Sequence, residues 1–232
     1  MVSSAPSSSL HEEVKKHAKR GFNKIWARAV RSLPSDRESD LEEDGQRRFD
    51  FSRINDSPPV LLGRIPRGEH DMLALQRAGV AAVVSLSEDW EIDEQEWTSN
   101  MVQRANMQWL RVPTPDFSAP TLLDLLVAVV FLLKFALRAP AAERESPGLG
   151  MDPRGYGRAV YVHCNRGRSR SALVVICYLM ARFGWQQGDA VEYVRAARAE
   201  ITLGPAFSSF WARLHAFGEG LSSRMRRRLA VS

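Results

Sequence analysis

The sequence predicts an α/β fold in which short strands alternate with helices around a hydrophobic core. Short runs rich in β-branched and apolar residues are typical of buried strands, and segments with helical periodicity separate them. The apolar fraction of 44% is ample for a core. A length of 232 residues fits one globular domain with extensions.

The first 48 residues are predicted to lie outside this domain. Residues 1–10 are rich in serine and are expected to be disordered. Residues 11–33 repeat apolar side chains every three or four positions among lysines and arginines, which predicts a basic amphipathic helix. Such a helix is typical of a mitochondrial or plastid targeting segment or of a membrane-surface anchor, although the acidic Glu12 and Glu13 argue against a transit peptide. A solvated helix docked on the domain is the alternative. Residues 34–48 are predicted to be an acidic linker.

The domain is expected to span residues 49–218, followed by a basic tail at 219–232. The predicted strands are 60–65, 80–86, 107–112 and 157–162. The predicted helices are 69–78, 94–105, 118–137, 172–180, 187–199 and 206–217. The acidic run Glu88–Glu91 is predicted to begin a loop, and the Pro- and Gly-rich residues 139–158 are predicted to form a loop excursion.

Composition excludes several classes of protein. The two cysteines, Cys164 and Cys177, exclude a disulfide framework and a cysteine-rich zinc site, and the five histidines are not paired at metal-ligand spacing. We therefore expect neither a metal nor another cofactor. The most apolar window, residues 122–137, is too short and too interrupted by charge to span a membrane. A net charge of +5 favours phosphates or anionic lipid surfaces as partners, and we expect no nucleic acid.

One stretch, Val162–Ser171, concentrates residues with chemical function. Cys164 follows a predicted strand, Gly167 lies in the loop, and Arg170 and Ser171 precede the apolar run of a predicted helix. A loop between a strand and a helix can turn its backbone N–H groups inward, and the helix adds its positive N-terminus. The pattern predicts an anion site with a thiol at its base.

A cysteine is nucleophilic only as the thiolate, and a free thiol with a pKa of about 8.5 is mostly protonated at neutral pH. The helix N-terminus, the loop amides and Arg170 would all stabilise the thiolate of Cys164. Arg170 would also hold two phosphate oxygens with its fork of donors, and Gly167 would supply the positive φ that a tight loop demands. The residues predicted to bind the phosphate are Asn165, Arg166, Gly167, Arg168, Ser169 and Ser171.

Attack by Cys164 on phosphorus would form a phosphocysteine, and a carboxylic acid would then protonate the departing alkoxide. Asp116 is the candidate acid, because it follows a predicted strand in a Pro-flanked loop; its alternative is a loop or helix-capping role. Ser171 would hydrogen-bond the cysteine sulfur as it leaves. Cys177 is predicted to be a core residue, and His163 a structural hydrogen-bonding group beneath the loop rather than a general base.

The stretch His163-Cys164-Asn165-Arg166-Gly167-Arg168-Ser169-Arg170-Ser171 resembles the signature of the dual-specificity cysteine phosphatases. More narrowly, the chain resembles the mitochondrial phosphatases that act on phosphatidylglycerophosphate. The likeness covers about residues 50–217 and includes an opening strand, an acidic-aromatic loop, the general acid and the segment before the last helix: Val60–Gly63, Ser87–Glu91, Asp116 and Ile201–Pro205. The resemblance implies a central mixed sheet of four to five strands flanked by helices, with phosphate monoester hydrolysis that needs no metal.

The sequence therefore predicts a cysteine-dependent phosphatase whose substrate is a lipid phosphate such as phosphatidylglycerophosphate. A dual-specificity protein phosphatase acting on phosphoproteins is the alternative within the enzymes. A non-catalytic phosphate-binding module is the alternative of another class, although a binding module needs neither a thiol nor an acid. The expected location is a mitochondrial or plastid membrane surface, with the cytoplasm as the alternative.

Overall fold

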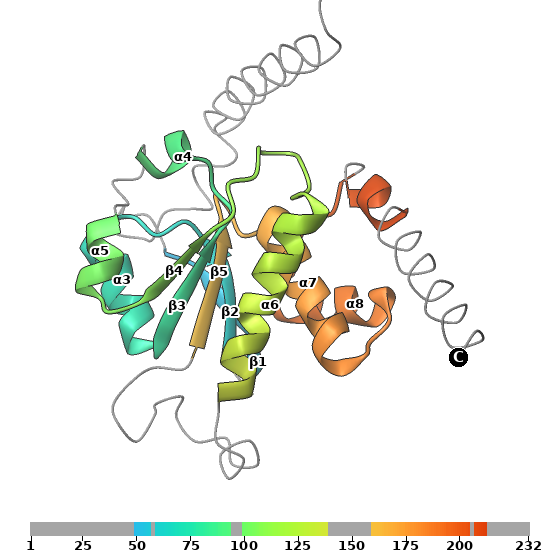
Figure 1. Ribbon diagram of the computed structural model, residues 1–232, viewed down its shortest axis with the longest axis horizontal. Helices are drawn as coiled ribbons and strands as arrows, with labels where there is room; N and C mark the ends of the chain where they lie inside the picture. Colours follow the sequence, from blue (N-terminus) through green and yellow to red (C-terminus); the bar gives the residue numbers. More distant parts are fainter. Residues whose placement is uncertain (1–48, 57–58, 94–98, 139–158, 205–206, 213–232) are drawn as a thin grey trace, which may run out of the picture. The chain divides into compact units, whose positions relative to one another are not determined.

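In the computed structural model, the described residues are 49–56, 59–93, 99–138, 159–204 and 207–212 (Figure 1). All of them belong to one compact unit, Phe49–Ser232. The predictions for residues 1–48, for the excursion at 139–158 and for the basic tail fall outside the described residues. Within the described part of the chain, no helix has the length and apolar character needed to cross a membrane.

A five-stranded mixed sheet forms the centre of the domain, as the sequence predicted. Its strands are β1 (Phe51–Asp56), β2 (Pro59–Arg64), β3 (Val80–Ser85), β4 (Gln108–Arg111) and β5 (Ala159–Cys164). The order across the sheet is β1-β2-β5-β3-β4. The edge strand β1 pairs antiparallel with β2, whereas β2, β5, β3 and β4 are parallel.

Helices cover both faces of the sheet (Figure 1). They are α3 (Gly68–Arg77), α4 (Asp89–Asp93), α5 (Ser99–Arg104), α6 (Leu122–Arg138), α7 (Arg170–Phe183) and α8 (Gln187–Ala197). Figure 1 shows α3 and α5 on one face and α6, α7 and α8 on the other. Residues 207–212 are also helical.

The parallel strands β2, β3 and β5 are buried on both faces, so alternate side chains enter two separate cores. Leu62 and Val84 pack into the larger core beneath α6 and α7. Their neighbours Leu61 and Val83 pack into the smaller core with Met72 of α3. This two-sided burial explains why the strands appear in the sequence as continuous apolar runs.

The central strand β5 positions the residues of interest. All six of its residues are buried, and it lies between β2 and β3. Cys164 is its last residue and is paired in register with Arg64 at the end of β2. Because the carboxyl ends of parallel strands meet at one edge of a sheet, the loops that follow β3, β4 and β5 converge there.

Two elements differ from the sequence prediction. Residues 51–56 form strand β1, where the sequence predicted no strand; Ile54 is its one fully buried residue, so its apolar pattern is weak. The acidic run predicted to begin a loop instead forms the short helix α4. The carboxylate of Glu91 accepts a hydrogen bond from the backbone N–H of Glu88 at 2.9 Å, which caps the first turn.

Candidate active site

The loop from Cys164 to Arg170 joins the end of β5 to the start of α7 at the carboxyl edge of the sheet. Gly167 has a φ of +68°, the left-handed conformation expected for it. A β-carbon at this position would overlap the backbone carbonyl of Gly63 in β2. Glycine is therefore required both by the conformation of the loop and by its close approach to β2.

The thiol of Cys164 lies at the base of this loop and is 2% exposed. Ser171 donates a hydrogen bond from its hydroxyl to the sulfur at 3.2 Å. Burial raises the pKa of Cys164, but the charge of Arg170 and the hydrogen bonds from the side chain and backbone of Ser171 outweigh it, while Asp116 opposes them. The net result is a pKa lowered from that of an ordinary thiol. The site therefore favours the nucleophilic thiolate.

Arg170 is the first residue of α7 and is 1% exposed. Its Nη1 donates to Glu91 Oε2 at 2.7 Å and its Nη2 donates to Glu91 Oε1 at 2.9 Å, so a buried carboxylate binds both terminal nitrogens of the guanidinium. Nη1 also donates to the carbonyl of Thr114 at 2.8 Å. Although burial acts in the opposite direction, Glu91 and Asp116 raise the pKa of Arg170, which keeps this side chain charged.

Asp116 lies in the loop between β4 and α6, opposite the Cys164 loop. Its Oδ1 is 3.1 Å from Arg170 Nη2, and its side chain is 17% exposed. The structure thus brings together the three residues predicted to be catalytic. Arg170 Nε is buried and has no hydrogen-bond partner among the described residues. One edge of the guanidinium therefore has a free donor at Nε beside the Nη2 that contacts Asp116.

The residues predicted to bind phosphate all lie on the loop or the first turn of α7. Asn165, Gly167 and Ser171 are buried, whereas Arg166 and Arg168 are half-buried. The loop and the helix N-terminus together provide backbone N–H groups and partial positive charge for an anion. Among the described residues, no group of three or more His, Cys, Asp or Glu could hold a metal ion.

The two residues predicted to be structural are buried as expected. His163 stacks on Tyr161 with ring centroids 5.6 Å apart, and its Nδ1 is 3.4 Å from the carbonyl of Cys164. Burial lowers the pKa of His163 to about 3, so the ring is neutral near pH 7. Cys177 lies in the larger core, and burial raises its pKa to about 12, so it is inert as a nucleophile.

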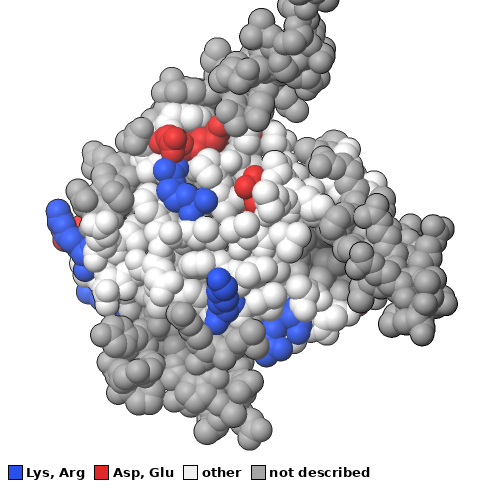
Figure 2. All heavy atoms as spheres, viewed as in Figure 1, with Lys and Arg blue, Asp and Glu red and all other residues white. Residues whose placement is uncertain are grey.

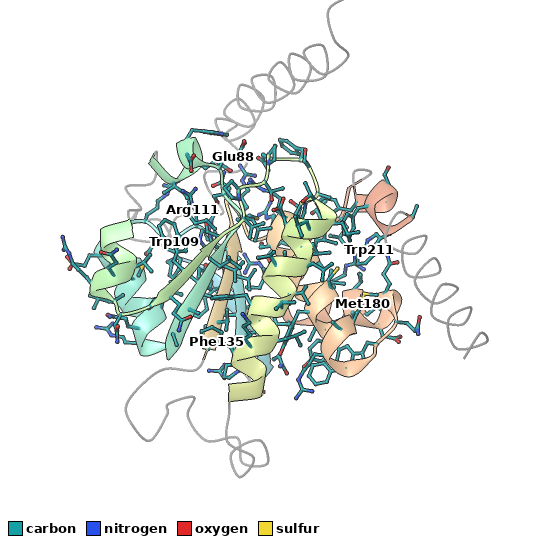
Figure 3. All side chains as sticks on the ribbon, in the orientation of Figure 1. Glu88, Trp109, Arg111, Phe135, Met180 and Trp211 are labelled. Atoms are coloured by element: carbon teal, nitrogen blue, oxygen red, sulfur yellow. The ribbon has the colours of Figure 1, made fainter. Side chains whose placement is uncertain are left out.

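Charged residues also surround the site at its rim. Arg111, at the end of β4, pairs with Asp89 of α4 at 2.5 Å. Figure 2 shows acidic and basic side chains next to each other near α4, and Figure 3 shows Arg111 on the same side of the domain as Glu88. Trp90 donates from its indole N–H to Glu88 Oε2 at 3.2 Å and is half-buried.

The partner of Arg170, Glu91, was not predicted from the sequence. Glu91 is 0% exposed, and it was assigned only to an acidic loop. Glu88 is not one of the Ser, Thr, Asp or Asn residues that mark a helix N-cap, so the local sequence carries only the glutamate half of a capping box and does not predict that Glu91 faces inward. The contact with Arg170, 79 residues away, has no local signal.

Comparisons with known proteins identify the family and the fold of the chain. Residues 152–219 match the family model "Dual specificity phosphatase, catalytic domain". The chain is 32% identical over 148 residues to the phosphatidylglycerophosphate phosphatase PTPMT2 of Arabidopsis thaliana, covering 63% of this chain and 55% of that protein. It is 31% identical over 161 residues to the human phosphatidylglycerophosphatase and protein-tyrosine phosphatase 1, covering 67% of this chain and 68% of the human protein.

Among solved structures, the crystal structure of PTPMT1 is similar, with a TM-score of 0.59 and 28% identity over 75% of this chain and 99% of that chain. The crystal structure of PTPMT1 in complex with PI(5)P has the same TM-score and identity, and the match covers 75% of this chain and 98% of that chain. These likenesses confirm the expected fold. The chain therefore belongs to the cysteine-dependent dual-specificity phosphatases, in the family of the phosphatidylglycerophosphatase and protein-tyrosine phosphatase 1 proteins.

Proposed function

We propose that the protein hydrolyses a phospholipid phosphate monoester, phosphatidylglycerophosphate, through a phosphocysteine at Cys164. The observation that carries the proposal is the buried thiol itself. Its pKa is lowered by Arg170 and Ser171 at the base of an anion-binding loop. A site that only bound phosphate would have no use for a stabilised thiolate, which argues against the non-catalytic alternative.

In the first step, the Cys164 thiolate attacks phosphorus, the S–P bond forms and the P–O bond to the leaving group breaks. Asp116 transfers its proton to the departing oxygen. In the second step, water attacks phosphorus, Asp116 takes a proton from that water, and the S–P bond breaks. The Ser171 hydroxyl, which lies 3.2 Å from the sulfur in the structure, would donate a hydrogen bond to the departing thiolate.

The contacts of Arg170 indicate how the phosphoryl group would enter. Glu91 and Thr114 accept hydrogen bonds from Nη1 of the guanidinium. A phosphate could therefore bind at the edge formed by Nε and Nη2, where it would replace Asp116 as the partner of Nη2. Two phosphate oxygens would take this edge as a bidentate pair and release Asp116 from Nη2.

The relatives support a lipid substrate. The Arabidopsis protein is named a phosphatidylglycerophosphate phosphatase, the mouse and human proteins are named phosphatidylglycerophosphatases, and one similar structure holds the phospholipid PI(5)P. A lipid phosphate on a primary alcohol has a poor leaving group, so its hydrolysis needs the acid that Asp116 would supply. The mouse and human names also include protein-tyrosine phosphatase, so phosphoproteins are the rival substrates.

The test compares substrates on the purified full chain. We expect release of phosphate from phosphatidylglycerophosphate in mixed micelles, with a kcat/KM well above that for phosphotyrosine and phosphothreonine peptides. Cys164→Ser should abolish turnover and retain substrate binding, whereas Cys177→Ser, which changes a core thiol of raised pKa, should retain activity. A preference for the peptides would overturn the lipid assignment, and turnover by Cys164→Ser would overturn the mechanism.

We further propose that the protein acts at a mitochondrial membrane, with residues 11–33 as the targeting or membrane-surface segment. The support is the basic amphipathic pattern of that segment. Cell fractionation with and without residues 1–33 tests this proposal. Loss of mitochondrial association on deletion is the expected result, and unchanged distribution would contradict it.

A further inference from the structure

Successive carbonyl groups of the Cys164 loop all accept hydrogen bonds from groups outside the loop. The acceptors are the carbonyl oxygens of residues 165, 166, 167 and 168 in turn. Their respective donors are Ile65 N at 3.2 Å, Arg198 Nη2 at 3.4 Å, Arg198 Nε at 3.1 Å and Thr202 N at 2.8 Å. One side chain, Arg198, thus supplies the donors for the two carbonyls in the middle of the loop.

These bonds determine where the loop amides point. In a trans peptide the C=O and the following N–H lie in one plane and point in opposite directions. A carbonyl held outward therefore turns the N–H of the next residue toward the inside of the loop. By this argument the N–H groups of residues 166–169 face the space above the Cys164 sulfur, where the phosphoryl group would bind.

Arg198 is well suited to this task and is itself firmly held. It is the C-cap residue of α8 and is 4% exposed. Its Nη2 pairs with Asp50 Oδ2 at 2.7 Å, and its Nη1 donates to Ser52 Oγ at 3.4 Å. A buried guanidinium needs a carboxylate to compensate for its lost hydration, and Asp50 supplies one from the residue before β1. Only a planar fork of several donors can reach the carboxylate and both loop carbonyls together.

We propose that Arg198, held by Asp50, is a positioning residue that sets the anion-binding conformation of the catalytic loop. It does not touch the substrate; it holds the carbonyls of Arg166 and Gly167 outward so that the following amides face the phosphate. The proposal rests on the proposed function in one respect, that the loop holds a phosphoryl group during catalysis. It does not depend on whether that group belongs to a lipid.

The test uses the full chain and three variants, Arg198→Met, Arg198→Lys and Asp50→Asn. Two readouts concern the loop directly: competitive inhibition by inorganic tungstate, and the pH midpoint for alkylation of Cys164 by iodoacetamide. We expect Arg198→Met to raise the inhibition constant of tungstate at least tenfold. It should also lower kcat/KM for p-nitrophenyl phosphate by about a hundredfold, the size of loss that follows when a catalytic group is displaced by a small distance. The alkylation midpoint should move to higher pH, because misdirected amides no longer stabilise the thiolate.

Arg198→Lys keeps the charge but replaces the planar fork of donors with a single nitrogen, which cannot reach both carbonyls and Asp50 together. Tungstate inhibition should therefore be weakened in this variant too. Asp50→Asn should weaken tungstate inhibition and raise the alkylation midpoint, both by less than Arg198→Met does. The matched controls are Arg195→Met, on the exposed face of the same helix, and Asp56→Asn, an exposed acid at the other end of β1; both should leave all readouts unchanged.

Thermal unfolding separates positioning from plain stability. If folded Arg198→Lys and Asp50→Asn lose melting temperature but keep tungstate inhibition and the alkylation midpoint of the parent, Arg198 is only structural and the proposal fails. These two variants keep the test decisive even if Arg198→Met does not fold. If the wild-type protein does not hydrolyse phosphatidylglycerophosphate but the variants still change tungstate inhibition as expected, the substrate assignment fails and this proposal stands.

Discussion

The buried ion pair between Glu91 and Arg170 gives the sharpest prediction of stability. Both side chains are almost completely buried, at 0% and 1% exposure, and two hydrogen bonds of 2.7 and 2.9 Å join them. Removing either partner leaves the other charge buried without its main counter-charge, which costs about 3–5 kcal/mol. Glu91→Met and Arg170→Met should therefore each lower the free energy of unfolding by about that amount.

The double variant distinguishes a coupled pair from two independent residues. With both charges replaced by apolar side chains, no unpaired charge remains, so the double variant should lose less than the sum of the single losses. We expect a coupling free energy of about 3 kcal/mol, at the upper end for contacting residues. Urea unfolding followed by tryptophan fluorescence measures all four proteins, and Glu88→Met serves as control because Glu88 contacts Trp90 and not Arg170. Losses that add to within about 0.5 kcal/mol would refute the coupling.

Three further predictions follow from the site. Alkylation of Cys164 should have its midpoint below the pH of about 8.5 expected for a free thiol, because the lowered pKa keeps the thiolate populated at lower pH. Ser171→Ala should move this midpoint upward, and an unchanged midpoint would show that Ser171 does not stabilise the thiolate. Asp116→Asn should slow alkyl phosphates far more than p-nitrophenyl phosphate, and equal slowing would remove Asp116 from the acid role. Gly167→Ala should abolish activity, because the loop has a positive φ and lies against Gly63, whereas Gly188→Ala, whose added β-carbon meets no neighbour, should be close to neutral in a thermal shift and activity assay.

The elements buried on both faces were the most predictable from the sequence. The strand predicted at 80–86 is observed at Val80–Ser85, and that predicted at 60–65 is observed at Pro59–Arg64. Their apolar runs are continuous because both faces meet a core. Strand β1 was missed because one face meets solvent and pairing with β2, rather than its own pattern, fixes it.

The loop chemistry was also accessible, because Cys164, Gly167 and Arg170 are close in the chain and their spacing carries the signal. The contacts that orient the loop were not. Glu91 reaches Arg170 across 79 residues, and Asp50 reaches Arg198 across 148 residues. An isolated acidic residue before an edge strand looks like a solvated surface residue, and only the assembled sheet brings it beneath the loop.

The central claim is that phosphate passes through Cys164, and trapping that intermediate tests it most directly. The full chain is mixed with phosphatidylglycerophosphate, denatured rapidly, digested and examined by mass spectrometry. Ser171→Ala serves to increase the intermediate, because its departing thiolate loses a hydrogen bond. We predict phosphate on the Cys164 peptide in the wild type, more of it in Ser171→Ala, and neither label nor turnover in Cys164→Ser. Turnover by Cys164→Ser, or phosphate bound to another residue, would contradict the account.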